Sequence, residues 1–291
     1  MEDETLARAR HHLAINQPRR AVDVLQSAAG ELSAQRYEAM ALAFSDLGEY
    51  EEAARVARRG LTLDPANREL SVVLGVALSQ LGEHAQALQL LYRAVAAQPE
   101  NLWFGAVYAE GLINAGSLAA ASRAIVQLSS LAPNALMTRR ILARYHFVTG
   151  DLEAAQRVAR GLLADHPDDD FAPLILGDID AARYRHQESA RWFSRAAPHH
   201  LDNPRVMAVV REEVALTRWF IRPYTGLTRG QGAWWGCLAL MAFLVAQGLI
   251  RAGHEGWALG LLGVMTAAGC YLLWAHLFVR AAARSRSGPR T

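Results

Sequence analysis

The chain has 291 residues, of which 52% are hydrophobic and 20% charged, and its formal net charge is +2. Residues 1–203 carry a net charge of −5 and residues 204–291 one of +7, which argues against a nucleic-acid-binding protein with a basic stripe on its folded body. All 30 basic residues are arginine, which excludes any mechanism that needs a lysine nucleophile, a Schiff base or a P-loop lysine.

A period of 34 residues runs through the first two thirds of the chain. A fixed period of this length predicts helix–turn–helix repeats. In each repeat the glycine is expected to end the first helix in a left-handed conformation, and the proline to stop the second helix or begin the next unit. The recurring positions are Gly48, Gly82, Gly116 and Gly150, Pro65, Pro99, Pro133 and Pro167, and Ala53, Ala87, Ala121 and Ala155.

Because of these columns, residues 2–203 resemble the tetratricopeptide repeat family. The resemblance implies an all-α, right-handed solenoid of about six helix-turn-helix repeats, and a protein-binding scaffold rather than an enzyme. Degenerate units are expected at both ends, where one face meets water. We predict a solenoid over 1–203, with clear units at 34–67, 68–101, 102–135 and 136–169 and degenerate units at 2–33 and 170–203.

The solenoid is followed by a predicted capping helix and juxtamembrane linker over residues 204–230, and then by a membrane segment. Residues 232–250 contain no charged side chain, and residues 256–279 contain none apart from a titratable His276. Each stretch is long enough to cross about 30 Å of hydrocarbon. We therefore predict a transmembrane helical hairpin over 231–279, with a basic tail over 280–291.

The flanks of these apolar stretches predict their depth and orientation. Tryptophans and arginines gather at membrane interfaces, and the expected interfacial residues are Trp234, Trp235, Trp257, Trp274, Arg280 and Arg284. Arginines outside the hairpin outnumber the single Arg251 in its short link. The positive-inside rule then places both termini in the cytoplasm. We expect a two-span protein of the bacterial inner membrane.

Catalytic and metal-binding patterns are missing from the sequence. We find no GxSxG, P-loop or HExxH motif, and Cys237 and Cys270 lie in apolar stretches without metal or disulfide spacing. Three consecutive carboxylates at residues 168–170 are expected to cap a helix start. We expect no enzyme activity, metal, cofactor or small-molecule substrate.

The inner face of the predicted solenoid is the candidate binding surface. Arg140 and Arg144 lie one turn apart, so together they could grip a carboxylate or phosphate, or else pair with Glu110 and Asp178. Apolar anchors of the kind enriched at interfaces flank them. The predicted groove consists of Trp103, Glu110, Met137, Arg140, Arg144, Phe147, Phe171 and Asp178.

These features predict a membrane-tethered scaffold that binds a peptide or helix of a partner protein in its cytoplasmic groove, next to the lipid bilayer. Two alternatives remain open. The chain could be an assembly or chaperone factor for a membrane or envelope complex, with client contacts through the hairpin. It could also be a non-catalytic subunit of an enzyme complex.

Overall fold

The computed structural model describes residues 4–27, 33–218, 221, 245, 247 and 255–284. Within these residues the secondary structure consists of α-helices and one short 3-10 helix, without a strand. The all-α fold predicted from the sequence is therefore confirmed.

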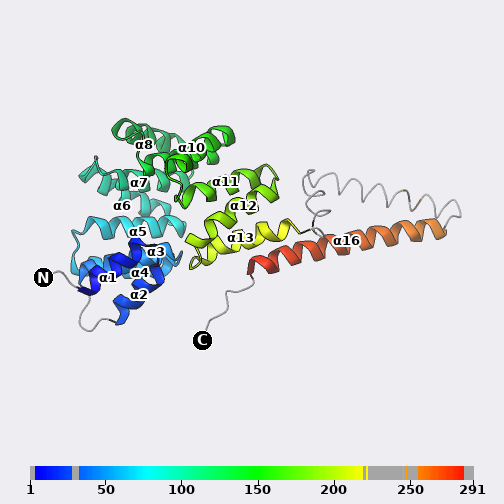
Figure 1. The fold of residues 1–291 in the computed structure, drawn as a ribbon, viewed down its shortest axis with the longest axis horizontal. Helices are drawn as coiled ribbons and strands as arrows, with labels where there is room; N and C mark the ends of the chain where they lie inside the picture. Colours follow the sequence, from blue (N-terminus) through cyan, green and yellow to red (C-terminus); the bar gives the residue numbers. More distant parts are fainter. Residues whose placement is uncertain are drawn as a thin grey trace.

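Twelve of the helices pack as six successive pairs (Figure 1). The pairs are α1 (Glu4–Ala14) and α2 (Pro18–Ser27), α3 (Ala34–Asp46) and α4 (Tyr50–Leu63), α5 (Arg68–Gln80) and α6 (His84–Ala97), α7 (Leu102–Asn114) and α8 (Leu118–Leu131), α9 (Leu136–Val148) and α10 (Leu152–Asp165), and α11 (Phe171–Ala182) and α12 (His186–Ala196). The chain continues through η1 (Ala197–His199) and α13 (Pro204–Leu216) to α16 (Glu255–Arg284).

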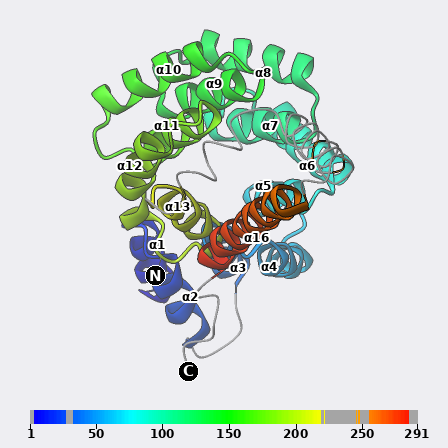
Figure 2. The same ribbon diagram turned by 90° about the vertical axis from the view of Figure 1, so that its right-hand side faces the viewer.

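The first helices of the pairs form one continuous layer. Each of α1, α3, α5, α7 and α9 contacts the first helix of the next pair, while the second helices lie outside them (Figure 2). The core lies between the two layers, where small residues such as Ala53, Ala87 and Ala155 are fully buried. This arrangement is that of a tetratricopeptide-like solenoid.

The glycine column ends the first helices in the predicted way. Gly48, Gly82, Gly116 and Gly150 have φ angles of 74°, 86°, 71° and 84°, a region that costs a residue with a Cβ about 1–2 kcal/mol. Tyr184 occupies the same column in the sixth pair with φ 57°. The sixth pair therefore keeps the left-handed turn after its first helix, although a tyrosine stands where the other pairs have glycine.

The stack of pairs closes on itself. Asn16 Nδ2, in the turn between α1 and α2, donates a hydrogen bond to the His199 carbonyl, and Asn203 Nδ2 donates one to the Asp46 carbonyl at 3.1 Å. We call this junction between residues 199–205 and residues 16–50 the seam. The paired helices closed by the seam form a ring, with α13 on its inner side (Figure 2).

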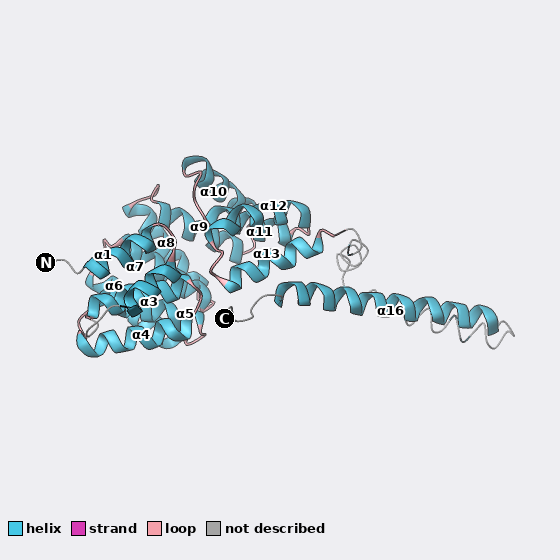
Figure 3. Ribbon diagram, turned by 60° about the horizontal axis from the view of Figure 1, so that its bottom comes forward, coloured by secondary structure: helices cyan, strands magenta, loops and turns pink. Residues whose placement is uncertain are grey.

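Helix α16 extends away from the ring except at its C-terminal end (Figures 1 and 3). There Ala275 and Val279 are buried in a cluster with Ile221, and Leu216 and Phe278 pack against it. The structure thus joins this end of α16 directly to α13.

One stretch of the described chain, Leu261–Ala282, is long and apolar enough to cross a membrane, and little of it is buried. The first predicted span, 232–250, lies outside the described residues except for residues 245 and 247, which are helical. The two-span hairpin therefore stays a prediction.

Candidate functional site

A pocket of about 210 Å³ opens on the inner face between α7, α9 and α11. Six of the eight predicted groove residues line it, namely Trp103, Glu110, Met137, Arg140, Arg144 and Phe171. Of the other two, Phe147 packs against the core between α10 and α11, and Asp178 interacts electrostatically with Arg144. The sequence pattern thus indicated residues that the fold brings together.

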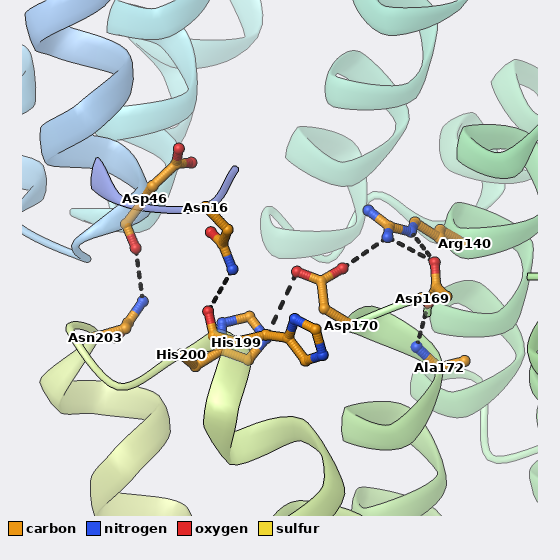
Figure 4. A network of polar contacts seen from close by, with 9 residues as sticks. All are labelled: Asn16, Asp46, Arg140, Asp169, Asp170, Ala172, His199, His200 and Asn203. Carbon is orange, nitrogen blue, oxygen red and sulfur yellow. Dashed lines mark hydrogen bonds and ion pairs between the residues drawn. The ribbon is translucent and has the colours of Figure 1, made fainter. Parts of the chain in front are cut away.

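Arg140 is bound by the loop before α11 through its Nε and Nη2 atoms (Figure 4). Its Nε and Nη2 donate to Asp169 Oδ2 at 2.8 and 2.6 Å, and Nη2 also donates to Asp170 Oδ1 at 2.7 Å. Asp169 Oδ1 accepts from the Ala172 backbone N–H at 2.6 Å, so this carboxylate both caps α11 and binds the guanidinium. The sequence predicted the capping, but it did not predict the pairing with Arg140.

Arg144 is held more loosely than Arg140. Its Nη2 donates to Asn114 Oδ1 at 3.2 Å, and its Nε lies 3.6 Å from Glu110 Oε1. At this distance Arg144 and Glu110 form an ion pair but not a hydrogen bond. The Nε atom of Arg144 is buried and has no hydrogen-bond partner. Arg144 therefore makes fewer and longer polar contacts than Arg140 does.

Two carboxyl groups, those of Asp178 and Asp46, have raised pKa values. Desolvation raises the pKa of Asp178 to about 6, against the opposing effect of Arg144 and with a further rise from Glu213. Desolvation and the charge of Asp170 raise the pKa of Asp46 to about 6.

Tyr50 connects the two sides of the ring. The Arg205 guanidinium lies over its ring, 4.5 Å from the centroid, in cation–π geometry. Burial raises the pKa of Tyr50, Glu110 and Asp46 raise it further, and Arg205 and Arg144 lower it. Of these groups, Arg205 on α13 is the one in direct contact with the Tyr50 ring.

A second pocket, of about 310 Å³, lies at the seam and is lined by residues 15–18, Asp46 and residues 198–203. His200 Nε2 lies there, 3.7 Å from Asp170 Oδ2, and burial lowers the pKa of His200. Asp170 thus lies between Arg140 and the seam (Figure 4).

Sequence reasoning missed Asp46, Tyr50, His200 and Arg205 as inner residues. They lie at helix ends or in residues 199–205 of the seam, and none of them belongs to a column of the 34-residue repeat. Among the described residues, no group of three or more His, Cys, Asp or Glu side chains could hold a metal.

The predicted interfacial residues fall largely on α16. Trp274 is half exposed and Arg280 is exposed, and Trp257 and Arg284 lie on the same helix. Trp234 and Trp235 lie outside the described residues.

Comparisons with known proteins support the repeat assignment. A tetratricopeptide repeat model matches residues 38–101 and 141–203. A thermophilic tetratricopeptide repeat protein of Thermus thermophilus is 17% identical, with a TM-score of 0.54 over 62% of this chain and 99% of that one. No curated protein matches significantly.

Two further solved structures are similar over shorter or looser alignments. A tetratricopeptide repeat protein of Parabacteroides merdae is 13% identical over 72% of this chain and 98% of that one, with a TM-score of 0.44. YrrB, described as having an unusual peptide-binding site, is 20% identical over 58% and 88%, with a TM-score of 0.39.

Proposed function

We propose that this chain is a membrane-anchored scaffold that binds a segment of a partner protein on the inner side of its ring. The repeat fold supports the scaffold role, since tetratricopeptide proteins are generally non-catalytic. The observation that carries the binding site is the pocket between α7, α9 and α11, which combines apolar anchors with the incompletely bonded Arg144. Aromatic and arginine side chains in a recess are typical of interface hot spots.

The membrane role is supported by the exposed apolar surface of α16. Leu259, Val264, Leu273 and Leu277 are each more than half exposed, and a soluble monomer rarely leaves such a continuous apolar surface in water. The 22 residues of Leu261–Ala282 extend over about 33 Å at 1.5 Å per residue, which matches the hydrocarbon core.

The contact between α16 and α13 supports the predicted topology. Val279, near the C-terminal end of the proposed span, packs in a cluster with Ile221, so this end of α16 would face the ring and the end that begins at Glu255 would face the opposite side of a bilayer. With the apolar stretch 232–250, we propose a second crossing between residues 221 and 255. By the positive-inside rule, Arg280 and Arg284 favour a cytoplasmic location for the ring. A reporter fused to Thr291 that reads as extracytoplasmic contradicts this orientation.

Site-directed photo-crosslinking tests the binding role. A photo-reactive residue in place of Met137, which lines the pocket and is 38% exposed, should capture one discrete partner in native membranes. Arg144→Glu should abolish the capture. The control site is Val126, which is 66% exposed on α8, and equal capture there contradicts the proposed site.

An anchor exchange separates this function from the assembly-factor alternative. Replacement of 231–279 by an unrelated two-span anchor should leave the Met137 crosslink intact. Loss of the crosslink in the exchanged chain, with the ring still folded by circular dichroism, favours client contacts through the hairpin instead.

A further inference from the structure

We propose that the junction between α13 and α16 selects anionic phospholipids, whose headgroup phosphates contact Arg218 and Arg280. The inference rests on the membrane role proposed above for α16, and it adds the kind of lipid that the chain prefers. Three observations support it. The fold places both arginines beside one buried cluster, both are exposed, and acidic residues are scarce around them.

Arg218 is fixed beside α16 by the turn that ends α13. Its backbone N–H donates to the Ala215 carbonyl at 3.2 Å, and its own carbonyl accepts from the Ile221 N–H at 2.9 Å. Ile221 is fully buried in a cluster with Val279 of α16. The guanidinium carbon of Arg218 lies 5.9 Å from the centroid of the Phe278 ring, which is within cation–π range. Arg218 therefore contacts the C-terminal part of α16 directly.

Arg280 lies at the same level of the junction, because it follows the buried Val279 directly in the chain. Arg280 and Arg218 are both exposed. Residues two apart on a helix do not face each other, so Arg280 does not lie on the side of α16 where Arg218 covers Phe278. The two arginines thus form a basic band around this end of α16, which faces more than one lipid.

The basic band lies at the depth of the lipid headgroups when α16 spans a bilayer. Glu255 begins the helix, and a charged residue of this kind stays outside the hydrocarbon. About 20 residues of helix cross about 30 Å of hydrocarbon, which brings the chain to residue 275. Trp257 and Trp274 then lie near the two interfaces, and residues 276–280 lie among the headgroups on the ring side.

Acidic side chains are scarce around the basic band. Residues 214–291 contain eight arginines and one acidic residue, Glu255, at the other end of α16. Glu213, the last acidic residue before this stretch, is paired with His186 at 3.0 Å. Within the described parts of the chain, neither Arg218 nor Arg280 forms an ion pair with a carboxylate. Exposed arginines at a membrane surface attract anionic lipids, and here no internal carboxylate competes for them.

Native mass spectrometry of the detergent-solubilised full chain tests the proposal. Phosphatidylglycerol and phosphatidylcholine with identical acyl chains are titrated separately, and the dissociation constant of the first bound lipid is measured. Phosphatidylglycerol should bind at least about tenfold more tightly, and Arg218→Gln and Arg280→Gln should each weaken its binding about fivefold. Binding of phosphatidylcholine should not change in these variants. Equal affinities of the wild type for the two lipids overturn the proposal.

Two further variants separate lipid binding from damage to the fold. Arg218→Lys keeps the positive charge and should retain most of the preference for phosphatidylglycerol, whereas a loss as large as that of Arg218→Gln contradicts a role of charge. Arg123→Gln, at an exposed position on α8 far from α16 (Figure 1), should bind both lipids like the wild type. Equal weakening in Arg123→Gln and Arg218→Gln overturns the assignment to the junction.

A competition experiment identifies the source of the phosphate. Inorganic phosphate in large excess should leave phosphatidylglycerol bound, because the acyl chains also lie against α16, and displacement overturns the lipid assignment in favour of free phosphate. Carbonate extraction of cell membranes separates this inference from the proposed function. A chain that stays in the pellet but shows no lipid preference refutes the inference alone, whereas a chain that carbonate extracts refutes the membrane role as well.

Discussion

Arg140 and Arg144 lie one turn apart on α9 but have different surroundings. The carboxylate that binds Arg140, that of Asp169, has a fully buried side chain, whereas Arg144 and its partner Glu110 are each more than a third exposed. A buried charge that loses its partner is costly, and an exposed pair contributes little. The two arginines should therefore separate into a structural residue and a binding residue.

We predict that Arg140→Ala lowers the free energy of unfolding by about 3 kcal/mol, because Asp169 Oδ2 is left buried without its counter-charge. Arg144→Ala should cost less than about 1 kcal/mol. Urea unfolding of the detergent-solubilised chain, followed by tryptophan fluorescence, measures both. Adding Asp169→Asn to Arg140→Ala should recover part of the loss, and equal losses for both arginines contradict the distinction.

Asp178 should make the fold less stable at neutral pH. Its folded-state pKa of about 6 lies above the value of 3.8 for the free side chain, so the native state binds the proton more tightly than the unfolded state. The stability contributed by this proton is fully present below about pH 4 and is lost as the pH rises through 6. Asp178→Asn should therefore raise the melting temperature at about pH 8 and leave it nearly unchanged at about pH 4. Lower stability at both pH values contradicts the assignment.

At the scale of the helices, α13 is the element that joins the ring to α16. His186 on α12 pairs with its Glu213, and Leu216 at its end packs on the cluster that holds α16. The ring is therefore attached to α16 by packed side chains. This contact gives the ring a set orientation relative to α16.

A charge in the middle of α16 should prevent its insertion. Leu273 is 61% exposed near the centre of Leu261–Ala282, and an arginine at the centre of a membrane helix costs about 2.5–3.5 kcal/mol. Leu273→Arg should shift the chain towards the carbonate-soluble fraction of cell membranes. Leu63→Arg, at a position 59% exposed on α4, is the matched control and should stay in the pellet. Unchanged partitioning of Leu273→Arg contradicts the span.

The sequence was sufficient for the helix pairs and for most of the inner pocket. Gly150 and its equivalents mark the ends of helices at a fixed period, and a stripe on each first helix follows from helical geometry. The sequence did not predict the partners of Arg140, because Asp169 and Asp170 come from the loop before α11, where consecutive carboxylates indicate helix capping. It also missed Arg205 on Tyr50, because contacts across 155 residues leave no periodic trace.

At the scale of the whole molecule, the seam changes the solenoid from an open stack to a ring. Asn203 holds it in two ways, since Oδ1 accepts from the backbone N–H groups of Arg205 and Val206 while Nδ2 donates to the Asp46 carbonyl. Asn16 and Arg19 add contacts to His199 and Asp202. Few polar contacts thus join the two ends of the repeat array.

Asn203→Asp should open the seam while preserving the start of α13. Aspartate keeps the capping oxygen, but it loses the donor to Asp46 and adds a negative charge beside acidic groups. Hydrogen exchange should accelerate in the α1–α2 turn and at the end of α3, reflecting a loss of about 1–2 kcal/mol. Asn101→Asp is the control, since Asn101 caps α7 and bonds only within its own turn. Identical exchange in both variants contradicts the role of the seam.

Closure has a mechanical consequence. An open repeat array, in which each repeat contacts only its neighbours, can extend and bend. An array whose ends are joined keeps its diameter as long as the contacts between the ends persist. A pull on α16 acts on α13, which is held both to α12 by the His186–Glu213 pair and to the Asp46 carbonyl by Asn203. The closed array should therefore resist extension until the contacts that Asn16 and Asn203 make across the seam are broken.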